Sequence, residues 1–227
     1  MSNKKEEKEK NTTILKDFYL RKAAGDSVTL FWNGNSIRKS WKDGGFKKIV
    51  NDTMADHIFF IEAKCGIHQL PVDLKHFLVS EGYLHHYEHV SQKEPAKWGY
   101  AGIICFSKVQ AAKVLKGIDH PELDIEGRAL TLFFNDQAIS GVYFPNSGKP
   151  GELMYMGKKI LFMDEYDKFL DRIIPIGFPV LVGGDTNVAR KTIDVFDRTD
   201  SPWNKHAPSC TVEEQKAFQK SPPTRQS

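Results

Sequence analysis

Short apolar runs alternate with polar segments along the chain, and this pattern predicts a series of strands. Runs rich in β-branched and aromatic residues, each bounded by turn-forming residues, are typical of strands. They occupy residues 28–32, 57–61, 101–106, 129–134, 138–144 and 179–182. Asn135-Asp136 predicts a tight turn between the fourth and fifth runs. The last run is predicted to be a buried strand that ends at Gly183-Gly184.

Apolar residues at helical spacing predict helices between these strands. The predicted helices cover 37–50, 71–79, a long segment within 152–174, and 211–218. Gly44-Gly45 is expected to weaken or break the first helix. Thr211 and Glu214 have the spacing of a capping box at the start of the last helix.

The order of these elements indicates the fold class. Strands mixed with helices, several of the strands almost entirely apolar, imply sheets that are covered by helices. We expect one α/β domain over residues 15–220. Residues 1–14 form a mixed-charge run and residues 221–227 a Ser- and Pro-containing end, so both are predicted to be disordered tails.

Composition narrows the functional classes only moderately. The net charge of +3 and the pI of about 8.6 permit a polyanionic partner without requiring one. The apolar runs are much shorter than the roughly 20 residues of a membrane helix, and the charged N-terminus does not resemble a signal segment. The three cysteines are far apart and form no CxxC pair, so we interpret them as free thiols in a reducing compartment.

Polar residues stand at the ends of four of the predicted strands, where functional groups of layered α/β folds gather. They are Asn33 and Asn35, Glu62 and Lys64, Tyr143 and Asn146, and Asp185 and Asn187. If these strand ends converge, they combine two carboxylates with amides and a phenol. Carboxylate oxygens suit Mg²⁺, and such a set suits hydrolysis of a phosphate ester.

Each of these residues also has a purely structural interpretation. An Asn or Asp after a strand is often a turn residue. Glu62 and Lys64 could form a surface ion pair, and Tyr143 could close the core with its hydroxyl outward. His85, His86 and His89 could suggest a metal site, but without an evident fourth ligand we expect solvated histidines.

A series of motifs resembles one known family. In chain order they read W-N-G-N-S-I-R (32–38), I-E-A-K-C (61–65), G-Y-A-G (99–102), E-G-R (126–128), Y-F-P-N-S-G (143–148), G-D-T-N-V-A (184–189), I-D (193–194) and T-V-E-E-Q (211–215). Over residues 28–218 the chain resembles the exonuclease III class of apurinic/apyrimidinic endonucleases, in the endonuclease/exonuclease/phosphatase superfamily. The resemblance implies a layered sandwich of two mixed β-sheets flanked by helices.

The resemblance also implies a metal site and a catalytic set. Glu62 and Asn35 would bind Mg²⁺, for which Mn²⁺ could substitute. Tyr143 would hold the scissile phosphate, Asp185 would deprotonate the attacking water, and Asn187 would position the phosphate.

Further residues are implied to contact phosphate or the DNA backbone. They are Asn33, Lys64, Tyr100, Asn146 and Lys149. Because the net charge is small, DNA binding would depend on a local basic patch. We expect that patch to consist of Lys64, Lys97, Lys149 and Arg190.

The chain also departs from the family pattern. Ser36 stands where the family usually has Gly, Ile61 replaces a Gln, and Ala63 replaces a Thr. The sequence ends soon after Phe218, without the family's W-R-x-D and S-D-H segments. We therefore expect an incomplete second sheet, loss of apolar cover over residues 129–134 and 179–182, weak activity, and self-association or a partner that completes the sheet.

The expected function is Mg²⁺-dependent cleavage of double-stranded DNA 5′ to abasic sites, with 3′–5′ exonuclease activity as an addition. The expected location is the nucleus in a eukaryote and the cytoplasm otherwise, without a membrane partner. One alternative is a catalytically impaired paralogue or isoform that acts as a nucleic-acid-binding or regulatory protein. The other is a superfamily branch that acts on RNA, lipid or inositol phosphates. It ranks lowest, because those branches tend to carry His where this chain has Tyr143-Phe144-Pro145-Asn146.

Overall fold

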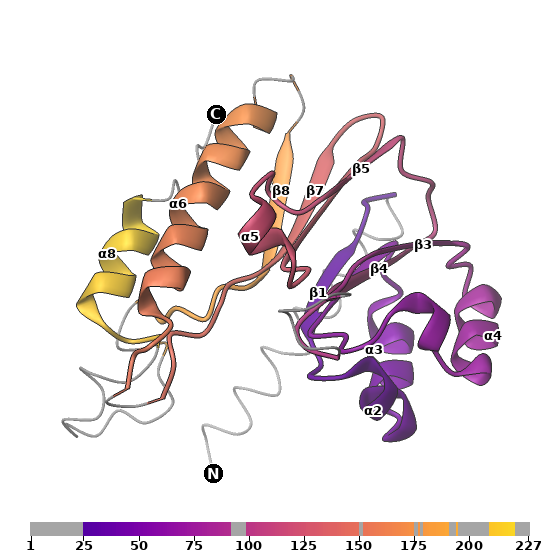
Figure 1. The fold of residues 1–227 in the computed structure, drawn as a ribbon. Helices are drawn as coiled ribbons and strands as arrows, with labels where there is room; N and C mark the ends of the chain where they lie inside the picture. The colour runs from indigo at the N-terminus through magenta and orange to yellow at the C-terminus, as the bar shows by residue number, and fades with distance from the viewer. Residues whose placement is uncertain are drawn as a thin grey trace, which may run out of the picture.

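Two four-stranded sheets lie face to face at the centre of the molecule, and helices cover their outer faces (Figure 1). The computed structural model describes residues 25–91, 99–149, 152–174, 177, 179–190, 194 and 209–220. Within these residues, the predicted architecture of two mixed sheets flanked by helices is confirmed.

The first sheet has the strand order β1-β2-β4-β3. Its strands are β1 (Thr29–Asn33), β2 (His57–Ile61), β3 (His85–His89) and β4 (Ile103–Ser107). β1 and β2 are parallel, whereas β4 runs antiparallel to both β2 and β3. The elements that pack on its outer side are α2 (Ile37–Lys42), α3 (Gly45–Thr53), the 3-10 turn η1 (Ile67–Gln69) and α4 (Val72–Ser80).

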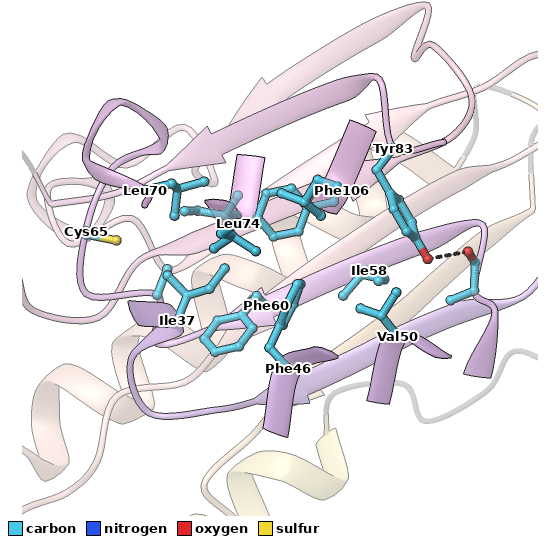
Figure 2. Packing of buried hydrophobic residues seen from close by; sticks show 14 residues of the cluster. Ile37, Phe46, Val50, Ile58, Phe60, Cys65, Leu70, Leu74, Tyr83 and Phe106 are labelled. Carbon is cyan, nitrogen blue, oxygen red and sulfur yellow. Dashed lines mark hydrogen bonds between the residues drawn. The ribbon is translucent and has the colours of Figure 1, made fainter. Parts of the chain in front are cut away.

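The core between this sheet and its helices is built from large apolar side chains (Figure 2). Ile58 and Phe60 of β2 point toward the helices, where Phe46 of α3 packs against Phe60. The Tyr83 hydroxyl donates a 2.7 Å hydrogen bond to the Ala55 carbonyl within this buried layer. The alternating side chains of β2 therefore serve two cores, one on each face of the sheet.

The second sheet has the order β5-β6-β7-β8. Its strands are β5 (Lys113–Lys116), β6 (Ala129–Phe133), β7 (Ala138–Tyr143) and β8 (Val180–Asp185). β7 and β8 are parallel and the other pairs antiparallel. The helices of this half are α5 (Pro121–Asp124), α6 (Met156–Ile173) and α8 (Val212–Lys220).

The two sheets share a further core that forms the middle layer between them. Phe59 and Ile61 of β2 face Leu130 of β6 and Ile139 of β7 across this layer. Gly141 leaves room for this packing, because a Cβ at that position would lie 2.3 Å from the Phe59 ring. The close approach of the sheets brings their strand ends to the same region of the molecule.

Most predicted elements are confirmed, with boundary shifts of a few residues. The helix predicted at 37–50 is divided into α2 and α3, and Gly44 at the break has a φ of 76°. The capping box is also confirmed, because the Glu214 amide donates to the Thr211 hydroxyl and the Thr211 amide donates to the Glu214 carboxylate.

Two predictions about burial were wrong. β8 was predicted to be buried, but it is an edge strand with Leu181 44% and Val182 40% exposed, and it continues through Gly183-Gly184 to Asp185. Residues 129–134 were expected to lose cover, yet β6 lies between β5 and β7 and is buried throughout.

The histidine interpretation also needs correction. His85, His86 and His89 lie on β3 and are partly buried, not solvated. A ring nitrogen of His86 hydrogen-bonds to the Tyr83 carbonyl, and one of His89 to the Ala129 carbonyl of the other sheet. Both tail predictions fall outside the described residues. Within the described ranges, no helix has the length and apolar character needed to cross a bilayer.

Candidate active site

The polar ends of four strands converge, as the sequence pattern predicted. β1 pairs with β2 in parallel and β7 pairs with β8 in parallel, so the ends of each pair lie at one edge of their sheet. Asn33 ends β1 and Glu62 directly follows β2. Tyr143 and Asp185 end β7 and β8 and are register partners.

Asn33 connects the two carboxylates of this cluster. Its Nδ2 atom donates a 2.9 Å hydrogen bond to Glu62 Oε1 and a 2.8 Å hydrogen bond to Asp185 Oδ2. Its Oδ1 atom accepts a 3.1 Å hydrogen bond from the Asn35 amide. Each end of the Asn33 amide group therefore has partners of the correct type, which fixes its orientation.

Glu62 lies where the backbone leaves the regular strand. Glu62 and Lys64 both have a backbone φ of 56°, a left-handed conformation that residues other than glycine adopt rarely and that the surrounding structure must hold in place. Backbone hydrogen bonds from Ala63 to Gly102 and from Lys64 to Ala101, each 3.0 Å, hold this segment. The Glu62 carboxylate is thereby directed to the cluster.

Lys64 forms the ion pair that the structural interpretation anticipated. Its Nζ atom lies 3.0 Å from Glu62 Oε2 and also donates to Asn35 Oδ1. Burial raises the pKa of Glu62, but hydrogen bonds from Asn33, Lys64 and Tyr143 and the Lys64 charge outweigh it and lower the pKa. Glu62 is therefore ionised at neutral pH.

Tyr143 is almost fully buried, with its hydroxyl hydrogen-bonded to Glu62. Burial, together with the negative charge of Glu62, raises the pKa of Tyr143 well above its usual value of 10. The phenol therefore remains protonated, and its O–H can donate to an anionic oxygen.

Arg128 is a residue beside this cluster that the sequence reasoning did not assign to the site. It was noted only as part of the E-G-R motif. Its buried guanidinium stacks 4.5 Å from the Tyr143 ring centroid and donates a 3.0 Å hydrogen bond to the Tyr100 hydroxyl. Arg128 thus connects Tyr100 to Tyr143, and the E-G-R motif was the only sequence signal that could have found it.

The loop after β8 is held by its own side chains. The Asn187 amide donates a 2.9 Å hydrogen bond to Asp185 Oδ1, and Asn187 Nδ2 donates a 2.9 Å hydrogen bond to the Phe144 carbonyl. Gly184, near the end of β8, permits the close approach of this strand to β7, since a Cβ there would lie 1.9 Å from the Val142 carbonyl oxygen. Asp185, Asn187 and Asn33 line an open cleft of about 610 Å³.

Asn146 and Lys149 are not brought into this cluster by direct contact. Asn146 Oδ1 accepts a 2.8 Å hydrogen bond from the Gly148 amide, and Lys149 pairs through its backbone with Glu152. In the described part of the chain, these contacts stay within the loop. The loop follows β7 directly, so the exposed Asn146 and Lys149 still belong to the same end of the sheet.

The oxygen ligands in the cluster fit a hard divalent cation. Glu62 Oε2 and Asn35 Oδ1 already converge on one positive charge, the Lys64 ammonium. No group of three or more His, Cys, Asp or Glu side chains suited to a metal occurs among the described residues. One or two carboxylates with amide oxygens match Mg²⁺, which retains several water ligands. They do not resemble the nitrogen- and sulfur-rich sites of zinc.

Known proteins with similar sequences place the chain in a family. No family model matches the chain. An exodeoxyribonuclease of Bacillus subtilis is 30% identical over 190 residues, which cover 82% of this chain and 68% of the relative. The chain belongs to the exonuclease III class of apurinic/apyrimidinic endonucleases. The resemblance stated from the motifs is thus confirmed, and the exonuclease III class supports assignment as a DNA-repair nuclease and hydrolase.

Two further comparisons were made, of which the second concerns the fold alone. The DNA-(apurinic or apyrimidinic site) endonuclease of Dictyostelium discoideum is 26% identical over 188 residues, covering 79% of this chain and 48% of the relative. The structure of an AP endonuclease from Archaeoglobus fulgidus aligns with a TM-score of 0.69 at 20% identity, over 86% of this chain and 69% of that one. The chain therefore spans about half to two thirds of the length of these relatives.

Proposed function

We propose that this protein is a Mg²⁺-dependent phosphodiesterase that cleaves the DNA backbone 5′ to abasic sites, with 3′–5′ exonuclease activity as a second reaction. The observation that carries the proposal is the double hydrogen bond of Asn33 to Glu62 and Asp185. It joins the carboxylate of the metal motif to the carboxylate of the G-D-T-N motif at an open cleft. The names of the similar proteins, exodeoxyribonuclease and apurinic/apyrimidinic site endonuclease, support the substrate class.

The two carboxylates are assigned different roles. Glu62 is ionised and would hold the cation together with Asn35. A bound Mg²⁺ would supply Lewis-acid stabilisation of charge on a phosphoryl oxygen. Asp185 has both oxygens oriented by donors, Asn33 Nδ2 and the Asn187 amide. We assign Asp185 as the base that takes the proton of the attacking water.

The neutral groups stabilise and position the phosphate. Tyr143 is protonated and would donate its O–H to a non-bridging oxygen as negative charge develops. Asn187 would position the phosphate from the loop after β8, which its hydrogen bond to the Phe144 carbonyl ties to β7, and Asn33 would border the phosphate. Asn146, on the loop after β7, would hold the phosphate with Tyr143, and Lys64, Tyr100 and Lys149 would contact the DNA backbone. A DNA substrate also favours the nucleus as the location in a eukaryote and the cytoplasm otherwise.

The test is incision of a duplex oligonucleotide that carries one stable abasic analogue and a 5′ label. We expect Mg²⁺-dependent cleavage on the 5′ side of the analogue and none of an intact duplex.

The matched variant is Glu62→Gln, which keeps the shape of the side chain and removes its charge. We expect it to abolish most incision while the thermal unfolding midpoint stays close to that of the parent. Incision that survives both this change and a chelator would contradict the metal assignment. Salt-sensitive DNA binding without any incision would favour the non-catalytic, nucleic-acid-binding alternative instead.

A further inference from the structure

A fully buried ion pair lies on the helix side of the second sheet, behind the candidate site. Lys159 of α6 and Glu214 of α8 have no exposed side-chain area, and Lys159 Nζ lies 2.6 Å from Glu214 Oε1. Packing two helices together does not need such a pair, because apolar side chains of similar volume often serve equally well or better. The other hydrogen bonds of Lys159 and Glu214 therefore indicate why a buried ion pair is present.

Glu214 is tied to the loop that follows β7. Its Oε1 atom accepts a 2.7 Å hydrogen bond from the hydroxyl of the buried Ser147, next to the exposed Asn146. It also accepts a 3.0 Å hydrogen bond from the Ser209 amide, while Oε2 accepts from Thr211. The carboxylate thus joins α8 to the Y-F-P-N-S-G loop.

Lys159 is tied to the other loop of the site. Its ammonium group donates to the Asn187 carbonyl as well as to Glu214. Asn187 in turn donates to Asp185 and to Phe144. One buried cation therefore reaches the loop after β8, while its partner carboxylate reaches the loop after β7.

We propose that Lys159 and Glu214 are positioning residues that fix the loop of Asn146 and the loop of Asn187 relative to each other. Neither side chain faces a substrate; each acts through the loop it anchors. The roles of the two asparagines rest on the proposed function, but the anchoring itself does not. Burial in a region of low dielectric makes the pair sensitive to geometry, so loss of one partner disturbs the other strongly.

The test compares Lys159→Met with Lys168→Met in the full chain. Both changes replace a lysine of α6 by a side chain of similar length and remove an ion pair. Lys168, however, is 63% exposed and pairs with Glu165 on the surface. Amide signals of Asn146, Ser147 and Asn187 in ¹H–¹⁵N spectra, together with their hydrogen-exchange rates, are measured below the unfolding temperature.

We expect Lys159→Met to shift the Asn187 and Ser147 signals and to accelerate exchange at the Asn187 amide by about tenfold or more, with no such change in Lys168→Met. In the incision assay, kcat should fall by about 10- to 100-fold with little change in KM, because small displacements of catalytic groups have effects of this size. If Lys159→Met does not fold, Glu214→Gln is used, since it preserves shape and weakens only the charge.

The outcomes separate the two proposals. Unchanged Asn187 and Ser147 signals and exchange in a folded Lys159→Met or Glu214→Gln variant would overturn the positioning role, whatever the incision rate. A parent chain that does not incise abasic DNA at all would overturn the proposed function, while the amide measurements would still decide the positioning role. An equal loss of stability and activity in Lys168→Met would also count against it.

Discussion

Asn33 donates a 2.8 Å hydrogen bond to Asp185, a residue 152 positions later in the chain. This contact joins the edge strand of one sheet to the edge strand of the other, β1 to β8. The same nitrogen of Asn33 also donates to Glu62, so a single neutral side chain holds two carboxylates at a defined spacing. Without it, two negative groups would face each other in a partly buried site, which raises the free energy of the ionised pair.

Asn33→Ala is expected to lower both stability and incision. The variant leaves two partly buried carboxylates without a shared donor, which costs roughly 1–3 kcal/mol in the free energy of unfolding. Loss of this preorganised group should lower kcat by about 10²-fold. Urea unfolding and single-turnover incision check the two effects. Asn135→Ala, at the exposed turn between β6 and β7, is the matched control and should change neither. Normal incision by Asn33→Ala would contradict the assigned role.

Folding stability is expected to decrease as the pH falls below about 6.5, because of His89. Burial lowers the pKa of His89 below its ordinary value of 6.5. Below that value the unfolded chain binds a proton that the folded protein does not, so protonation favours unfolding until the folded pKa is reached. Glu62 and Glu214 have pKa values lowered from 4.5 and stay ionised in this range.

Urea unfolding at pH 7.5 and pH 5.0 checks this prediction. His89→Gln should show a smaller loss of stability on acidification than the parent. His76→Gln, on the exposed side of α4, should behave as the parent does. A parent whose stability is the same at both pH values would show that His89 is not a source of acid sensitivity.

DNA affinity is expected to fall steeply with salt, because each phosphate contact releases counterions. Lys64, Lys149 and Arg190 are the described members of the predicted basic patch, while Lys97 lies outside the described residues. Replacing Lys149 with Gln should reduce the slope of log K against log salt by about 1. Lys116→Gln, on the edge strand β5, serves as the control. Equal slopes of log K against log salt for both variants would show that Lys149 does not contribute to DNA binding through the basic patch.

The edge of β8 is expected to support self-association of this chain when it is studied by itself. The outer edge of a strand at the side of a sheet, with exposed apolar residues, offers a template for pairing with another strand. Leu181→Lys should reduce concentration-dependent association measured by sedimentation velocity, since charge on an edge opposes pairing. Leu84→Lys makes the same change at a residue that is 64% exposed elsewhere on the surface. This control variant should not reduce the concentration-dependent association. A parent that stays monomeric at all concentrations would refute the expectation.

The sequence by itself was sufficient to predict most of the strands and helices. Apolar runs such as residues 57–61 predicted β2 correctly, because a buried strand needs a continuous apolar segment. The polar residues at the ends of four strands also indicated that Asn33, Glu62 and Asp185 would lie together, whereas Asn146 makes its contact within its own loop. Short edge strands were missed, because His85–His89 and Lys113–Lys116 are polar enough that only their neighbours in the sheet make them strands.

Only the tertiary structure decided how the site is held. No local pattern shows that one Asn33 nitrogen reaches both Glu62 and Asp185, or that Arg128 lies between Tyr100 and Tyr143. No sequence motif singled out Lys159, and Glu214 was predicted only as part of a helix capping box. Their burial depends on α6 and α8 packing together over the loops of Asn146 and Asn187. Sequence determines local preference, whereas burial and pairing between residues far apart in the chain arise only when the sheets and helices assemble.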